Sequence, residues 1–185
     1  MTKTASKIGF TAKLFRPKAT AQAVSWTFLT LPKAASAKLP SRGMTSVKGT
    51  LNGFPFRATL EPDGQGGHWL KVDRKTRETA CAEAGDLVTL EIAPLAVEPE
   101  PGVPDDLRKA LAVARQKASE TWSDITPLAR RDWIHWITSG KRAETRAKRI
   151  SVAISKLSAG DRRPCCFDRS GMYSKSLSCP VADDT

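Results

Sequence analysis

The sequence predicts an α+β protein in which a small β-barrel precedes about three α-helices. Apolar residues alternate with a period of two through most of the first 92 positions, and the period changes to about 3.6 past Val103. A proline-rich, acidic stretch separates the two patterns. We therefore expect a barrel domain at 8–96, a linker at 97–103, a helical region at 104–160 and a mobile tail at 161–185.

The clearest strand is the segment AGDLVTLEI at 84–92. Gly85 can adopt the positive φ that other residues resist, and the Asp86 carboxylate can fold back onto backbone N–H groups of the turn. The pair predicts where the strand begins, with Leu87, Leu90 and Ile92 as its apolar positions.

Earlier segments also predict strands. Alternation indicates strands at 8–15 and 23–31, and Asn52-Gly53 is the dipeptide that accepts the positive φ values of a tight hairpin turn at 46–60. Pro55 lacks an N–H group, so it belongs at an edge or a bulge. A further strand is expected at 68–72 and a helical turn at 74–80, whereas 33–40 fits either a short helix or a loop.

The second half carries helix start signals. Pro104, followed by Asp105 and Asp106 in the first turn, predicts a helix that runs to about Ser119. Thr126-Pro127 repeats the signal as a cap followed by proline, and Ser139-Gly140 ends that second helix.

The third predicted helix, 141–157, has two faces. One is an apolar stripe made of Ala143, Ala147, Ile150, Ile154 and Leu157. Rotation of about 100° per residue places a basic stripe on the opposite side. That stripe consists of Arg142, Arg146, Arg149 and Lys156. Gly160 is a plausible terminator.

Charge is distributed unevenly along the chain, whose net charge is +11. The first 60 residues contain no Asp or Glu but ten Lys or Arg, Arg57 among them, and 61–100 is acidic. Residues 101–163 are basic again. This asymmetry suggests a polyanion or an acidic partner, although a solvated basic surface explains it too.

Catalytic motifs are not evident. His68 and His135 are the two histidines, and neither has a cysteine or carboxylate at metal-ligand spacing nearby. No nucleophile elbow of the Gly-x-Ser-x-Gly type occurs. We therefore expect no enzymatic activity and no cofactor.

Three cysteines cluster near the C-terminus: Cys165, Cys166 and Cys179. Neighbouring arginines could lower their thiol pKa values and support a redox or metal site. Adjacent cysteines fit one tetrahedral ion awkwardly, however, and a nonfunctional tail is the simpler reading.

The order of these segments resembles a bacterial and archaeal family of small β-barrels of unknown function, followed by a bacteriocin-protection, YdeI/OmpD-associated helical region. The resemblance covers about 10–160 and rests on FTAKL, VKGTLNGFPFRATL, AGDLVTLEI, VPDDLRKAL and AETRAKRI. It implies a double-split β-barrel, similar in architecture to AbrB, MazE and MraZ proteins. It also implies a link to stress resistance and protection from antimicrobial peptides.

Three functional hypotheses follow. The first is a cytoplasmic, non-catalytic binding protein of the bacteriocin-protection type with an unknown anionic or protein partner. The second is a nucleic-acid-binding protein that uses the basic barrel surface with Arg57 and the stripe on the third helix. The third is a thiol redox or metal-binding protein. No apolar run is long enough to span a bilayer, and a homo-oligomer is possible.

Overall fold

The computed structural model describes residues 6–18, 24–165, 167–170, 172 and 177–183. The chain forms two compact units, each with its own core. Unit 1 comprises 1–97 together with 168–185, and unit 2 comprises 98–167.

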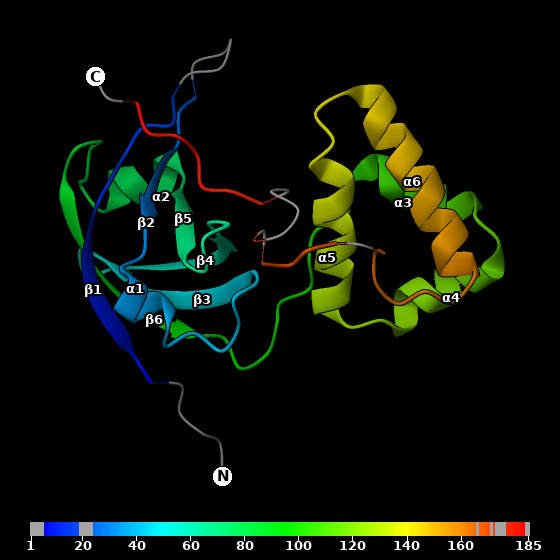
Figure 1. The fold of residues 1–185 in the computed structure, drawn as a ribbon, viewed down its shortest axis with the longest axis horizontal. Coiled ribbons are helices and arrows are strands. Elements are labelled where there is room, and N and C mark those ends of the chain that lie inside the picture. The colour runs from blue at the N-terminus through cyan, green and yellow to red at the C-terminus, as the bar shows by residue number, and fades with distance from the viewer. Residues whose placement is uncertain (1–5, 19–23, 166, 171, 173–176, 184–185) are drawn as a thin grey trace. The chain divides into compact units, whose positions relative to one another are not determined.

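Unit 1 is built on one six-stranded antiparallel sheet in the order β1-β6-β3-β4-β5-β2 (Figure 1). The strands are β1 (Ile8–Lys13), β2 (Thr27–Thr30), β3 (Thr45–Leu51), β4 (Phe54–Pro62), β5 (His68–Val72) and β6 (Leu87–Pro94). Two short helices, α1 (Lys33–Ser36) and α2 (Arg74–Thr79), connect strands. The segment at 33–40, for which two forms were open, thus begins with a helix.

The sheet curls until its ends almost meet. Just beyond β1, Phe15 exchanges two backbone hydrogen bonds with Phe28 of β2, at 2.8 and 2.9 Å. Inward-facing residues of all six strands, including Val47, Leu60 and Leu90, form one buried core. The structure therefore confirms the α+β class and the small β-barrel.

The predicted turns form for the expected reasons. Asn52 and Gly53 have φ of 49° and 85° and join β3 to β4, and Gly85 has φ of 100° before β6. The Asp86 carboxylate accepts a hydrogen bond from the Glu83 N–H at 2.8 Å. These four turn residues set the ends of the strands that carry the site described below.

The structure places Leu87 differently from the sequence prediction and Pro55 in agreement with it. Leu87 was expected among the apolar positions of its strand, but it is 73% exposed, because Val88, Leu90 and Ile92 alternate inward. Pro55 pairs with Thr50 of β3 on one side. On its other side no strand is paired among the described residues, because β5 pairs with β4 only at Glu61 and Pro62, so Pro55 lies at an edge as expected.

The segment beyond residue 167 lies in the part of the chain for which the sequence predicts a mobile tail. Its described residues belong to unit 1, where Lys18 donates to the Val181 carbonyl and Asp183 donates to the Arg16 carbonyl. The Leu177 side chain is only 3% exposed. The red end of the ribbon in Figure 1 follows this return to the barrel.

Unit 2 contains four helices among its described residues, where about three were expected. They are α3 (Asp105–Val113), α4 (Gln116–Asp124), α5 (Pro127–Thr138) and α6 (Ala143–Ser158). The expected first helix breaks because Ala114 and Arg115 have extended ψ values of 162° and 144°. At the break, the Leu111 carbonyl accepts both from the Ala114 N–H, at 3.3 Å, and from the Ser119 hydroxyl, at 3.0 Å.

The predicted start of α5 and the predicted terminator of α6 are confirmed. Thr126 caps α5 by accepting from the Ala129 N–H at 3.3 Å, with Pro127 in the first turn. Gly160, at φ of 91°, follows the end of α6. The core between the helices includes Leu107, Trp133 and Leu157, so Trp133 packs in the interior.

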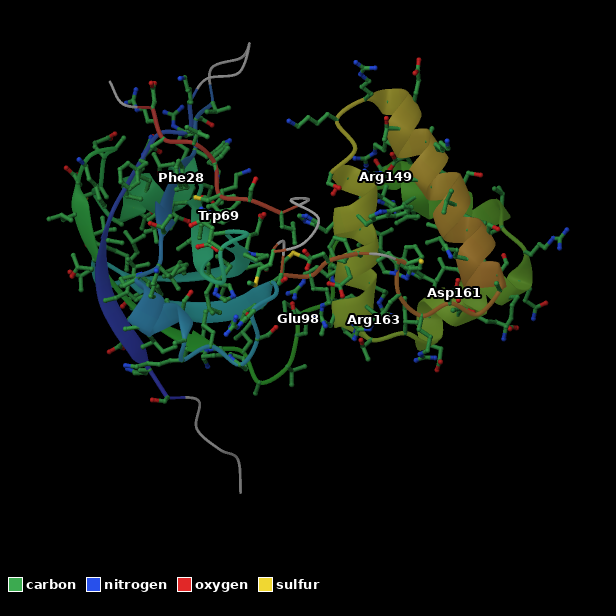
Figure 2. The ribbon with its side chains drawn as sticks, viewed as in Figure 1. Phe28, Trp69, Glu98, Arg149, Asp161 and Arg163 are labelled. Carbon is green, nitrogen blue, oxygen red and sulfur yellow. The ribbon has the colours of Figure 1, made fainter. Side chains whose placement is uncertain are left out.

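The proline-rich stretch is held to α5 by ion pairs. Glu98 pairs with Arg131, and Glu100 lies 2.6 Å from Arg130. Glu98 is labelled in Figure 2. The acidity that marks this stretch in the sequence therefore anchors it to unit 2.

Candidate functional site

The strongest candidate site is a basic hollow on the outer face of the barrel sheet, which we call the anion face. It has a volume of about 560 Å³ and lies over β3, β4 and β6. Its charged lining residues are Lys7, Lys48, Arg57 and Glu91. Alternation along the strands places Lys48 and Arg57 outward, opposite the buried Val47 and Leu60.

Lys48 and Arg57 are directly opposite each other in the β3–β4 ladder. Glu91 is engaged by Lys7, with Nζ and Oε1 2.7 Å apart. Within the described part of the chain, neither Lys48 nor Arg57 takes part in an ion pair or a side-chain hydrogen bond. Like charges directly across a ladder destabilise a sheet, so an anion between them would relieve a repulsion that is present in the free protein.

Gly49 allows the close approach of strands beneath this face. A Cβ at Gly49 would lie 2.0 Å from the Glu91 carbonyl oxygen and 2.8 Å from Ile92 Cα. The face thus combines a close-packed backbone floor with two cations that have no ion-pair partner among the described residues.

Arg57 was a candidate from the sequence, whereas Lys48 was only one of the early basic residues. A signal for the pair was nevertheless present. A two-residue Asn52-Gly53 turn sets the hairpin register, and Lys48 and Arg57 are each the fourth residue from that turn. Counting outward from the turn would have placed the two charges opposite each other.

The predicted basic stripe on α6 is engaged in contacts within unit 2. Arg146 forms a two-point pair with Asp106, at 2.5 and 3.0 Å, and this pairing lowers the pKa of the Asp106 carboxyl. Lys156 lies 3.3 Å from Asp161. Arg142 is exposed at the N-cap of α6.

Arg149 is bound to α5. Its Nη1 donates to the Trp136 carbonyl at 2.5 Å and to the Ser139 hydroxyl at 2.7 Å, and its guanidinium lies 5.4 Å from the centre of the Trp136 ring. Arg149 and Asp161 are labelled in Figure 2. Three of the four stripe residues therefore have internal partners.

The buried face of α6 also differs from the predicted stripe. Ala143 and Ala147 are exposed, and Ala153 and Leu157 are the buried positions. Pairing to Asp106 and stacking on Trp136 allow Arg146 and Arg149 to sit beside the apolar contact. The two arginines are consequently half-buried rather than opposite the core.

The three candidate cysteines are divided between the units. Cys165 is exposed in unit 2, Cys179 is a half-buried free thiol of unit 1, and Cys166 lies outside the described residues. Burial and the charge of Asp63 raise the pKa of Cys179 to about 11, opposite to the lowering that the neighbouring arginines suggested. No group of three potential metal ligands is found in the part of the chain that the structure describes.

The fold and site define a class of protein: a small antiparallel barrel with a basic outer face, followed by a helical domain. The comparisons identify both parts. Residues 10–92 match the family model of a domain of unknown function, DUF1905, and residues 100–160 match the family described as Bacteriocin-protection, YdeI or OmpD-Associated. The chain therefore joins a DUF1905 domain to a domain of the YdeI/OmpD-associated family.

The search of curated proteins returned no match. Among the described residues, none of the helices has the length and apolar character needed to cross a membrane.

Proposed function

We propose that this protein is a binding protein of the bacteriocin-protection type, and that its anion face recognises an acidic partner without catalysis. The observation that carries the proposal is the cross-strand pair of Lys48 and Arg57, which has no carboxylate partner among the described residues and lies over a hollow of about 560 Å³. A bound carboxylate would satisfy the Arg57 fork and the Lys48 ammonium together.

The open edge of β4 favours an extended peptide as that partner. From Phe54 to Leu60, β4 pairs with β3 and has no strand on its other side among the described residues. A peptide can add to such an edge by backbone hydrogen bonds, while its acidic side chains reach the basic residues beside it. The barrel then supplies both affinity and charge selection.

Nucleic acid is the second candidate, because backbone phosphates suit the same two cations, Lys48 and Arg57. The basic stripe on α6 gives this candidate less support than the sequence did, since Arg146 and Arg149 have internal partners.

A binding experiment separates the two partners. Fluorescence anisotropy is measured across a salt series with a labelled oligoglutamate and a labelled single-stranded oligonucleotide of equal charge. We expect tighter binding of the peptide, weakened about tenfold or more in Lys48→Ala/Arg57→Ala. The control, Lys38→Ala/Lys75→Ala, removes the same charge from exposed positions of unit 1.

The outcomes are distinct. Tighter binding of the oligonucleotide would assign the face to nucleic acid. Equal weakening in the two double variants would reduce the site to general surface charge and overturn the proposal. In cells, deletion of the protein should raise sensitivity to antimicrobial peptides, and the Lys48/Arg57 variant should fail to restore protection.

A further inference from the structure

A second, separate hollow of unit 1 is polar and has a volume of about 600 Å³. It lies between the end of α1, the stretch 39–42 and the loop 63–67. Ser36, the last residue of α1, lines this hollow and is 6% exposed. We call it the serine pocket.

Ser36 contacts a histidine that sequence spacing could not connect to it. The Ser36 hydroxyl oxygen is 2.8 Å from His68 Nδ1, and His68 Nε2 is 3.1 Å from the Gly43 carbonyl oxygen. His68 is the first residue of β5 and is 1% exposed. Three separate segments of the barrel therefore form a chain from hydroxyl to imidazole to carbonyl.

The contacts determine which ring nitrogen carries the proton. A carbonyl oxygen can only accept, so Nε2 holds the hydrogen and donates to Gly43. Nδ1 then carries a lone pair, and the Ser36 O–H donates a hydrogen bond to it. Burial lowers the pKa of His68, which keeps the ring neutral and able to accept a proton. The Gly43 carbonyl orients the ring as the third group of a triad does.

The charges around the serine pocket indicate which substrates it favours. Lys33 and Arg42 line it, and neither has an ion-pair partner among the described residues. The one carboxylate in the lining, Asp63, accepts from the N–H groups of Gln65 and Gly67 at 2.7 and 2.8 Å. A Cβ at Gly67 would lie 2.4 Å from Asp63 Oδ2, so glycine keeps this loop folded.

We propose that Ser36, with His68 as its base, is a nucleophile toward small esters that carry an anionic group. Ser36 Oγ forms a bond to the ester carbonyl carbon while its proton moves to His68 Nδ1. The bond to the alkoxide breaks, and the alkoxide takes that proton from His68 and leaves as the alcohol. Water then attacks the acyl-serine by the same proton route and releases the acid. Lys33 and Arg42 favour the anionic group and the developing oxyanion.

This activity uses different residues from the anion face, so either proposal can fail without the other. It also departs from the expectation of no enzymatic activity, which rested on motifs within short stretches of sequence. Ser36 and His68 are 32 positions apart and meet only in the folded barrel.

The test is labelling of the full chain with a fluorophosphonate, followed by peptide mapping. The Ser36 oxygen would form a bond to phosphorus, fluoride would leave, and the proton would pass to His68. We expect a single adduct at Ser36 that is absent in Ser36→Ala and unchanged in Ser25→Ala, an exposed serine of unit 1 that does not line the pocket. His68→Gln should slow labelling about 100-fold or more.

A pH profile separates a catalytic base from a structural one. Asp63 is the charged group that acts on His68, and His68 otherwise faces Ser36 and the backbone near Gly43. Labelling should therefore persist below pH 6.5 and decline only as the buried ring is protonated. Release of nitrophenol from an anionic ester, nitrophenyl succinate, should follow the same profile.

Absence of an adduct in the unaltered chain would overturn the proposal without reference to any variant. An adduct at Ser36 that forms equally fast in a folded His68→Gln variant would also overturn it. Folding of each variant is checked by its thermal unfolding midpoint.

Discussion

At the scale of single residues, Gly49 shows how one position can shape the anion face. The backbone of β6 passes so close to Gly49 that a Cβ would meet the Glu91 carbonyl oxygen at 2.0 Å. Backbone cannot move aside as a flexible side chain can. The hollow between Lys48 and Arg57 therefore depends on a residue without a side chain.

We predict that Gly49→Ala lowers the free energy of unfolding by about 3 kcal/mol or more, since overpacking against backbone forces the strands apart. Urea unfolding measures the change. Gly9→Ala in β1 is the matched control, because the nearest atom to its Cβ would be 4.0 Å away, and it should be neutral or slightly stabilising. Equal losses in the two variants would show that close strand approach is not the cause.

Local chemistry explains which residues could be placed from the sequence. The positive φ of Asn52, Gly53 and Gly85 and the bond from the Glu83 N–H to the Asp86 carboxylate follow from a few neighbouring residues. The bond from the Thr89 N–H to the Asn52 side chain, at 3.0 Å, depends on the fold instead. The Ser36–His68 contact could not be placed, because it depends on how α1 is set against β5.

At the scale of elements, periodicity located the strands and most helices but not the faces that helices bury. The extended residues at 114 and 115 break the first predicted helix without any proline or glycine. α6 buries a different face from the predicted one. The ion pair with Asp106 stabilises Arg146 beside the core, and stacking on Trp136 does the same for Arg149. The apolar pattern of one helix cannot predict these contacts, since the residues that contact the two arginines come from α3 and α5.

The returning segment at 177–183 gives the second stability prediction. Leu177→Ala should lower the free energy of unfolding of unit 1 by about 2 kcal/mol or more, as expected for truncation of a buried side chain. Val181→Ala in the same segment should change it by less than about 0.5 kcal/mol, because that side chain is 70% exposed.

Urea unfolding followed by tryptophan fluorescence compares these two variants. If Leu177→Ala were as stable as Val181→Ala, the result would favour the interpretation of this segment as a mobile, nonfunctional tail. A chain ending at Phe167 provides a second measurement, since loss of the backbone bonds at Lys18 and Arg16 should destabilise it further.

At the scale of the whole molecule, each unit has its own core and one histidine. Burial lowers the pKa of His68 in unit 1, and burial together with the charge of Arg131 lowers the pKa of His135 in unit 2. Both rings favour the neutral form when folded. The stability they confer is complete above the unfolded value of 6.5 and is lost as pH falls through the folded values.

We therefore predict that both units lose stability between pH 7.5 and 5.5, by at most about 1.4 kcal/mol for each histidine. Glu61 acts in the opposite direction, because burial raises the pKa of its carboxyl and its protonation favours the fold. Urea unfolding of His68→Gln and His135→Gln at both pH values separates the contribution of each histidine to the free energy of unfolding from that of Glu61. Each variant should lose the histidine's share of the pH response of its own unit and keep the response of the other unit; in His68→Gln the opposite contribution of Glu61 remains. A pH response that persists undiminished in both variants would contradict the assignment and place the titration on other groups.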